Sequence, residues 1–283
     1  MSPRFFIALQ YLLPQRWLTI ALSRVMNWRR PIWLKLTLIE WFIRRYKIDM
    51  SIAANPHIDL YLNFNNFFIR ALKPGARTLA QAPIISPVDG EISQIGRITE
   101  GALIQAKGLS YSLEDLLTLP SNLANTFHNG SFATIYLAPK DYHRVHMPIT
   151  GKLLQTIYVP GDLFSVNQIT AQNVVNLFAR NERLICEFET EGGKMVLIFV
   201  GALFVAGIST KWAGDVKRSK KIITTDYQNQ NIVLQQGEEA GYFKFGSTVI
   251  VLLPEGCFSW ENNLQAGHAI VMGQALARNI LPH

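Results

Sequence analysis

Short runs of β-forming residues, separated by Gly and Pro turns, dominate the chain from about residue 84 onwards. Runs bounded by such turn residues are typical of strands. One helix is expected among them at 112–117, where Ser112 and Asp115 form a capping box. The pattern therefore predicts a β-rich catalytic or binding domain. The expected strands cover residues 84–85, 90–98, 132–137, 151–159, 183–189, 195–200, 220–225, 231–235 and 248–253.

The first 50 residues follow a different pattern, which predicts three amphipathic helices broken at Pro14 and Pro31. They hold nine Lys and Arg against two acidic residues, whereas the rest of the chain holds 18 of each. Four of the six tryptophans lie in the same segment. Basic helices with Trp and Phe on the apolar face are typical of helices that lie in a bilayer interface. We expect contact with an anionic membrane surface. One alternative is that these helices form a subdomain packed on the core. Nucleic-acid binding is a weaker alternative that we do not expect, because the sequence contains no motif for reading RNA or DNA.

The two patterns together predict an α+β chain in two parts. Residues 1–55 are the basic, amphipathic, membrane-associating helical region, and residues 56–283 are the β-rich catalytic core, with a helix at 60–72 joining them. No run reaches the roughly 18 apolar residues that a spanning helix needs. Cys186 and Cys257 form no paired motif, so we expect a reducing compartment and neither a zinc site nor a disulfide framework.

Two motifs hold residues suited to acid–base chemistry. In the segment SPVDGEI (86–92), Pro87 and Gly90 favour a tight turn that would present Asp89 between two strands. YLAPKDYHRVHMPITG at 136–151 places His143 and His146 three residues apart, and imidazole suits proton transfer near neutral pH. Such a histidine pair could also bind a metal, but no Cys or third His lies nearby in the sequence, and no metal is expected.

A third motif, YFKFGSTVIVLLPEG at 242–256, puts Gly246 and Ser247 at the entrance to a strongly apolar strand. Both are weak strand formers. The Gly246–Ser247 pair therefore forms either a bulge or turn, or a peptide bond that is cleaved. In chain order, Asp89, His146 and Ser247 could supply an orienting acid, a base and a nucleophile. No G-x-S-x-G elbow is present, so a conventional serine hydrolase is not expected.

In this order and spacing, SPVDG, YHRVHMP and FGST resemble the motifs of the phosphatidylserine decarboxylase family. FNNFFIR and IQAKGLSYSLEDLL are similar to that family as well, and the resemblance spans about residues 60 to 255. The basic helical N-terminus suits the bacterial, membrane-associated members. One departure is Phe245, where the family usually has Leu before Gly-Ser-Thr, and this change could alter how the cleavage loop packs.

The resemblance implies a proenzyme that cuts itself between Gly246 and Ser247, with the Ser247 hydroxyl attacking the Gly246 carbonyl. It implies that Asp89 orients His146, that His146 is the base of self-cleavage, and that His143 is the proton donor of decarboxylation. From the sequence alone the two histidines could share both tasks. We expect a strained turn at Gly246, where the missing Cβ lets the hydroxyl approach the carbonyl.

The resemblance further implies an enzyme that makes its own cofactor, a pyruvoyl group derived from Ser247, and uses neither PLP nor a metal. A large chain, 1–246, and a small chain, 247–283, would form a heterodimer, and family members commonly dimerise further. A Schiff base between the pyruvoyl group and phosphatidylserine allows loss of CO2 and gives phosphatidylethanolamine. The implied location is peripheral, on the cytoplasmic face of the bacterial inner membrane.

Two alternatives stay open. A pyruvoyl-dependent decarboxylase of a soluble amino acid would not need a membrane-binding N-terminus. A non-enzymatic, membrane-associated β domain would leave Ser247 as a bulge residue and Asp89 as a turn residue. An intact Ser247 in the mature protein would exclude the pyruvoyl mechanism.

Overall fold

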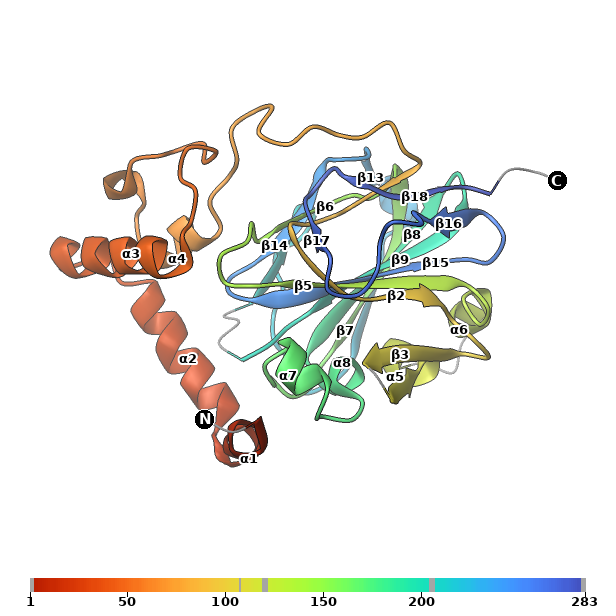
Figure 1. Ribbon diagram of the computed structural model, residues 1–283, viewed down its shortest axis with the longest axis horizontal. Helices are drawn as coiled ribbons and strands as arrows, with labels where there is room; N and C mark the ends of the chain where they lie inside the picture. The colour runs from red at the N-terminus through yellow and green to blue at the C-terminus, as the bar shows by residue number, and fades with distance from the viewer. Residues whose placement is uncertain (1–2, 107, 119–121, 204–206, 281–283) are drawn as a thin grey trace.

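The computed structural model describes residues 3–106, 108–118, 122–203 and 207–280. Strands make up most of the chain from residue 84 onwards, and the longest helices lie within the first 46 residues. The predicted α+β class is therefore confirmed. Figure 1 shows the N-terminal helices at one side of the β-rich part.

A nine-stranded antiparallel sheet forms the centre of the β-rich part. Its middle strand, β15 (Ser247–Leu253), pairs with β9 (Gly193–Val200) and with β5 (Ser131–Leu137). Every β15 residue is buried, as its continuous apolar run predicts. Beyond β9 lie β8 (Arg183–Thr190), β7 (Gly151–Val159), β12 (Ile223–Asp226) and β13 (Val233–Leu234), and beyond β5 lie β2 (Gly90–Arg97) and β17 (Ala269–Ile270).

A four-stranded sheet adjoins the central one. Its strand β14 (Glu239–Phe243) lies between β10 (Ile208–Thr210) and β6 (Arg144–His146). The chain passes from β14 to β15 within three residues, so the predicted cleavage site lies where the two sheets meet. The remaining strands are β11 (Gly214–Asp215) at the edge of this sheet, β1 (Ile84–Ile85), β18 (Ala275–Asn279) and β16 (Phe258–Trp260) in a third sheet, and β3 (Ala102–Ala106) with β4 (Leu109–Ser112).

Short helices connect the strands. The Ser112 half of the predicted capping box is confirmed, because the Ser112 hydroxyl accepts the backbone N–H of Asp115 at 2.9 Å and the helix begins one residue later. The short helices and 3₁₀ turns are η1 (Ile58–Leu60), α5 (Leu113–Leu117), α6 (Asn122–Thr126), α7 (Gln168–Ala171), α8 (Leu177–Arg180) and η2 (Gln228–Gln230).

Three helices precede the sheets, as predicted: α1 (Pro3–Leu12), α2 (Gln15–Met26) and α3 (Ile32–Tyr46). The first of them is fastened to the β-rich part. The Gln10 side-chain oxygen accepts the backbone N–H of Ser165 at 2.7 Å, and the Tyr11 ring packs edge-on against Phe164. Packing on the core therefore holds for α1 and for the start of α2, where the Gln15 side chain accepts the backbone N–H of Leu163 at 2.8 Å, whereas α3 lies further out in Figure 1.

The helix predicted at 60–72 is formed only in part, as α4 (Phe64–Phe68). The Asn63 side chain caps its first turn, which fixes where it begins. Just beyond it, a β-bridge joins Leu72 to Ala53, so the chain is extended there. Pairing with a distant segment is a tertiary contact that local periodicity does not reveal, and the longer helix was therefore a wrong prediction.

Aromatic side chains join α3 to α4. The Phe42 ring lies 5.1 Å from Phe64 and 6.0 Å from Phe68, centroid to centroid, in edge-to-face geometry. These residues belong to an apolar cluster beside the main core, and Tyr242 and Phe245 pack against it. The helical region and the segment that holds the cleavage motif are therefore packed together.

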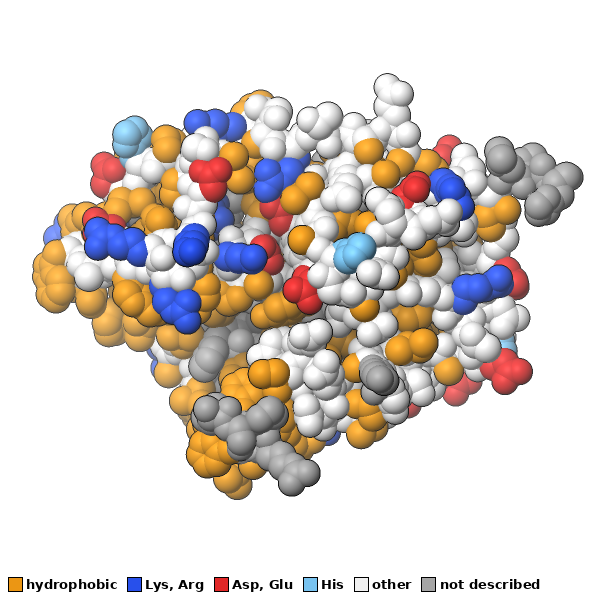
Figure 2. Space-filling view, in the orientation of Figure 1, with side chains coloured by type: hydrophobic (Ala, Val, Ile, Leu, Met, Phe, Trp, Pro, Cys, Tyr) orange, Lys and Arg blue, Asp and Glu red, His pale blue; other side chains and the backbone are white. Residues whose placement is uncertain are grey.

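Exposed apolar side chains gather on the N-terminal helices. Trp17 is 76% exposed, Trp33 is 67% exposed and Trp41 is 54% exposed. Figure 2 shows hydrophobic side chains along α3 and around α1, with Lys and Arg side chains beside them on α3. A contiguous surface of this kind is typical of an interaction site. Among the residues described here, no helix has both the length and the hydropathy needed to cross a membrane.

Candidate active site

The three sequence motifs meet at the junction of β14 with β15. The backbone N–H of His146 donates to the Pro87 carbonyl at 2.8 Å, which holds the second motif against the first. The second motif also pairs with the third, because β6 is hydrogen-bonded to β14 and Leu137 lies opposite Ser247. Residues that are far apart in the sequence therefore form one site.

Ser247 is the first residue of β15, and its side chain is fully buried. Its hydroxyl oxygen has no hydrogen-bond partner among the residues that the structure describes. Leaving a buried hydroxyl without a partner is unfavourable, so such a group calls for a functional explanation. The hydroxyl is not engaged elsewhere and is available to act as a nucleophile.

Gly246 does not have the strained conformation that we expected. Its φ lies outside the left-handed region, and an added Cβ would meet only the Leu137 carbonyl oxygen, at 3.7 Å. That distance is an ordinary van der Waals contact, so the expectation of backbone strain was wrong. The missing side chain leaves the Gly246 carbonyl accessible without storing strain.

His146 is a neutral imidazole whose proton position follows from its partners. Nδ1 lies 2.8 Å from the Gly237 carbonyl, which can only accept, so Nδ1 carries the proton. Nε2 then accepts from the Tyr142 hydroxyl at 3.1 Å. The pKa of His146 is lowered, mainly by burial. The hydrogen bond to Gly237 and the Glu239 carboxylate act in the opposite direction and raise it, but by less. A neutral ring with its lone pair at Nε2 is the form that a general base needs.

Asp89 has a different partner from the one expected. Its carboxylate forms a two-point ion pair with Arg77, with 3.1 Å between Nε and Oδ1 and a second contact between Nη2 and Oδ2. It also accepts the backbone N–H of Met272 at 2.8 Å. Both ring nitrogens of His146 have other partners, so Asp89 does not orient His146 through a direct hydrogen bond among the described residues. A bidentate bond to a guanidinium is stronger than a single bond to a neutral ring.

Arg77 could not be found from the sequence, because a lone arginine in a Gly- and Ala-rich stretch follows no pattern. In the structure it ties the segment before β1 to the turn that holds Asp89. Asp89 influences His146 through space, by raising the pKa of the imidazole. These contacts hold the turn in place, and the assignment of Asp89 to catalysis stays a prediction.

Asp89→Asn and Arg77→Gln should each lower the free energy of unfolding by about 1–3 kcal/mol, because each leaves the other partner of a mostly buried pair unmatched. Urea denaturation measures the change. The control is Arg97→Gln, whose exposed pair with Glu255 contributes less than about 1 kcal/mol. A loss in the Asp89 variant without a comparable loss in the Arg77 variant would contradict the pairing.

His143 is fully buried against an aromatic ring. Its imidazole stacks on Phe68 with 4.1 Å between ring centroids. Nε2 lies 3.1 Å from the Ala138 carbonyl and so carries the proton, while Nδ1 has no partner among the described residues. Burial and, after it, the charge of Arg70 lower the pKa of His143 to about 3. The ring is therefore neutral, and it acts as a cationic acid only after it has taken up a proton.

Phe245, the residue that departs from the family pattern, extends this stack. Its ring lies 4.6 Å from Phe68, with 15° between the ring planes. Phe68 is therefore sandwiched between His143 on one side of the stack and the residue before Gly246 on the other. The stack couples the packing of the cleavage loop to the position of His143.

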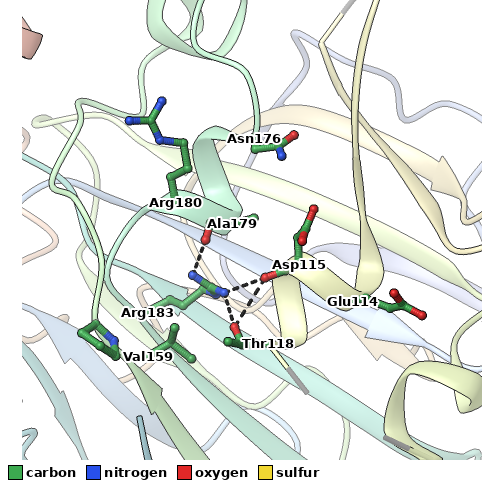
Figure 3. Close-up of a pocket in the computed structure, with 9 residues that line it drawn as sticks. Glu114, Asp115, Thr118, Val159, Asn176, Ala179, Arg180 and Arg183 are labelled. Atoms are coloured by element: carbon green, nitrogen blue, oxygen red, sulfur yellow. Dashed lines mark hydrogen bonds between the residues drawn. The ribbon is translucent and has the colours of Figure 1, made fainter. Parts of the chain in front are cut away.

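A separate cavity shares no lining residue with this site. It measures about 490 Å³ and lies beside α5 and α8. Figure 3 shows the Arg183 guanidinium in its wall, donating to the carbonyls of Ala179 and Asp115 and to the Thr118 hydroxyl. These bonds within the protein give Arg183 a structural role. Across the described residues, no three or more His, Cys, Asp or Glu side chains gather as they would around a metal ion.

The site brings together a serine without a partner among the described residues, two neutral imidazoles and a Gly-Ser step at the entrance of a central strand, and it lacks the G-x-S-x-G elbow of serine hydrolases. The family model described as phosphatidylserine decarboxylase matches residues 64–278, and a model described as PSD matches residues 5–47. The relatives that match over nearly the whole chain are named phosphatidylserine decarboxylase proenzyme. The protein of Marinobacter nauticus is 46% identical, and the match covers 98% of this chain and 99% of the relative. The protein of Methylibium petroleiphilum is 48% identical, with 98% of each chain covered. The protein of Alcanivorax borkumensis is 50% identical, with 94% of this chain and 93% of the relative covered.

The chain belongs to the phosphatidylserine decarboxylase family and is a decarboxylase. The resemblance seen in the sequence is confirmed, and the alternative of a non-enzymatic β domain was wrong. The matched regions lie on either side of residue 55, where we placed the boundary between the two parts, and that boundary stays a prediction.

Proposed function

We propose that this protein converts phosphatidylserine to phosphatidylethanolamine and CO2, using a pyruvoyl group that it makes from Ser247 by cutting its own chain. The names of the full-length relatives support the substrate. The observation that carries the proposal is the buried Ser247 hydroxyl, which has no partner in the described part of the chain and directly follows Gly246.

Self-cleavage begins at this hydroxyl. Ser247 Oγ attacks the Gly246 carbonyl carbon while Nε2 of His146 takes the hydroxyl proton, so the amide becomes an ester and the Ser247 nitrogen a free amine. Loss of the Ser247 Cα proton then expels Gly246 as a carboxylate and leaves dehydroalanine at position 247. Water hydrolyses this residue through its imine, releasing ammonia and leaving the pyruvoyl group. The neutral form of His146 supports this assignment of the base, and in this step Nε2 exchanges the Tyr142 hydroxyl for that of Ser247.

The residues around position 247 fit such a group. Its carbonyl supplies an electron sink for the carbanion that loss of CO2 leaves. Burial restricts the access of bulk water to this position, and the two neutral imidazoles hold exchangeable protons within the site. His143 remains our proposed proton donor, with the condition that its neutral form gains a proton during the cycle.

The two product chains stay together in this proposal. The small chain, 247–283, contributes β15 to the middle of the central sheet, where it is hydrogen-bonded on both edges. All of its β15 side chains are buried, so separation would expose a large apolar surface. A heterodimer of chains 1–246 and 247–283 follows from this packing.

The test of this function uses the processed protein and vesicles that contain phosphatidylserine. CO2 and phosphatidylethanolamine should appear, and sodium borohydride added during turnover should fix the lipid amine to the fragment 247–283, as mass spectrometry would show. Free serine should be turned over far more slowly. Equal turnover of free serine would favour the decarboxylase of a soluble amino acid instead.

We further propose that α2 and α3 dock on the cytoplasmic face of the bacterial inner membrane. Their exposed tryptophans and the positive charge of the first 50 residues support an interfacial position. A lipid substrate also requires the site to approach the bilayer surface. The apolar cluster that joins α3 and α4 to Phe245 links the docking helices to the site.

The double variant Trp33→Ser, Trp41→Ser should bind anionic vesicles roughly tenfold more weakly, because it removes two exposed aromatic side chains from α3. Co-sedimentation with vesicles measures the affinity. Ile104→Ser is the matched control, since it removes an exposed apolar side chain from β3 instead. Equal binding by the double variant and the control would refute docking through α3.

A further inference from the structure

Arg70 is a buried cation whose donors are not all used. Its residue is 5% exposed, and its Nε and Nη1 atoms have no hydrogen-bond partner among the described residues. The guanidinium lies over the Phe67 ring, 5.4 Å from its centroid. An arginine keeps its charge even when buried, and a buried charge without a bound counter-ion is costly. Unused donors in this setting indicate a place for an anion.

Arg70 lines a cavity of about 270 Å³ beside α4, and its two unused donor atoms are buried next to it. Its described lining includes a second arginine, Arg144, the polar side chains of Asn55 and Asn66, and no acidic residue. Arg144 is already bound to the Glu239 carboxylate and to the Ile69 carbonyl. Asp89 and Asp141 act on Arg70 only through space. The charge without a bonded counter-ion in this cavity is therefore that of Arg70.

The cavity lies between the membrane-binding helices and the active site. On one side, Leu60 and Leu62 line it and are each 59% exposed, and Lys35 from α3 donates to the Tyr61 carbonyl at 2.7 Å. On the other side, Arg70 lies two residues after Phe68 in the chain, and the Phe68 ring stacks on His143. A ligand with an anionic group between an apolar part and a reacting head would fit this placement.

We propose that the Arg70 guanidinium binds the phosphodiester of the phospholipid substrate in this cavity. The proposal rests on the function proposed above and assigns the substrate's phosphate to a residue. The serine carboxylate is the less suitable anion, because it loses its charge as CO2 leaves. A cation that held it would stabilise the substrate more than the transition state. The phosphodiester keeps its charge throughout the reaction.

Binding at Arg70 would also act on His143. The charge of Arg70 is the second cause, after burial, of the low pKa of this histidine. An anion on Arg70 offsets that charge, so the pKa of His143 should rise when the lipid binds. Proton uptake by His143 would then be favoured only when substrate is present.

The test compares Arg70→Gln and Arg70→Lys with the control Arg97→Gln, whose side chain is exposed in a different region. Chain processing and melting temperature are measured first, to show that the variants fold. Calorimetry then gives the affinity for dihexanoyl phosphatidylethanolamine, which keeps the phosphate and lacks the carboxylate. The KM for dihexanoyl phosphatidylserine is measured in parallel.

Arg70→Gln should weaken product binding and raise KM by a similar factor of about ten to a hundred, with little effect in Arg97→Gln. The product affinity and the KM of Arg70→Lys should lie between those of the unaltered protein and of Arg70→Gln, because lysine keeps the charge but lacks the planar guanidinium. If Arg70→Gln does not fold, the lysine variant alone still has to weaken binding of the product.

Three results would overturn the assignment. A raised KM for the substrate with unchanged product affinity would mean that Arg70 holds the carboxylate. Unchanged values for both would mean that it holds neither. Inorganic phosphate that binds as tightly as the short-chain lipid would point to a site for free anions. If the unaltered protein binds the product through Arg70 but does not decarboxylate, the proposed function fails and the phosphate site stands.

Discussion

Replacing Ser247 with alanine should leave one uncut chain with no decarboxylase activity. The variant lacks the only atom that we assign as nucleophile, and without cleavage no pyruvoyl group forms. The fold should survive, because the lost hydroxyl is buried and has no partner among the described residues. We expect the free energy of unfolding to change by less than about 1 kcal/mol. Denaturing gel electrophoresis and a CO2-release assay measure the two outcomes.

The matched control is Ser131→Ala. Ser131 is also a mostly buried serine, and it lies at the far end of the same strand pair, opposite Leu253. This variant should be cut and active. Appearance of the fragment 247–283 from the Ser247→Ala chain would show that the cleavage site was assigned to the wrong bond.

Replacing His146 with glutamine should slow self-cleavage by a factor of about 10² to 10⁴, the usual contribution of a general base. The glutamine amide can still donate to the Gly237 carbonyl or accept from Tyr142, the two partners of the imidazole. It cannot take up the hydroxyl proton. The time course of fragment formation after synthesis in a cell-free system measures the rate.

His128→Gln is the control, because this histidine is exposed and shares no contact with the motifs. Cleavage of the His146 variant at the rate of the control would remove His146 from the mechanism. The pH dependence gives a second check. Burial lowers the pKa of His146, so the neutral base persists as the pH falls below the usual range of histidine. The cleavage rate should therefore fall only at a pH lower than that of an ordinary imidazole.

The sequence was a good guide to elements that local pattern determines. The three N-terminal helices, the capped helix after Ser112 and the strands of the central sheet follow from periodicity and turn residues. It failed where distant segments decide the outcome. Several strands outside the predicted set, such as β6 and β14, are defined by the partner that lies beside them. The bridge between Ala53 and Leu72 shortened an expected helix for the same reason.

The site shows the same division. Asp89, His143, His146 and Ser247 were found as residue types within motifs, and the structure brings their motifs together. The partners of these residues were not predictable. Neither the ion pair of Asp89 nor the stack of His143 on Phe68 leaves a periodic or compositional signal.

Intact-mass spectrometry of the purified protein under denaturing conditions tests the central claim most directly. Self-processing predicts two species, a chain that ends at Gly246 and a 37-residue chain, 247–283, whose mass corresponds to a pyruvoyl group in place of its N-terminal serine. A single species of 32.0 kDa in a preparation that decarboxylates phosphatidylserine would contradict the account, because activity would then not require the cut between Gly246 and Ser247.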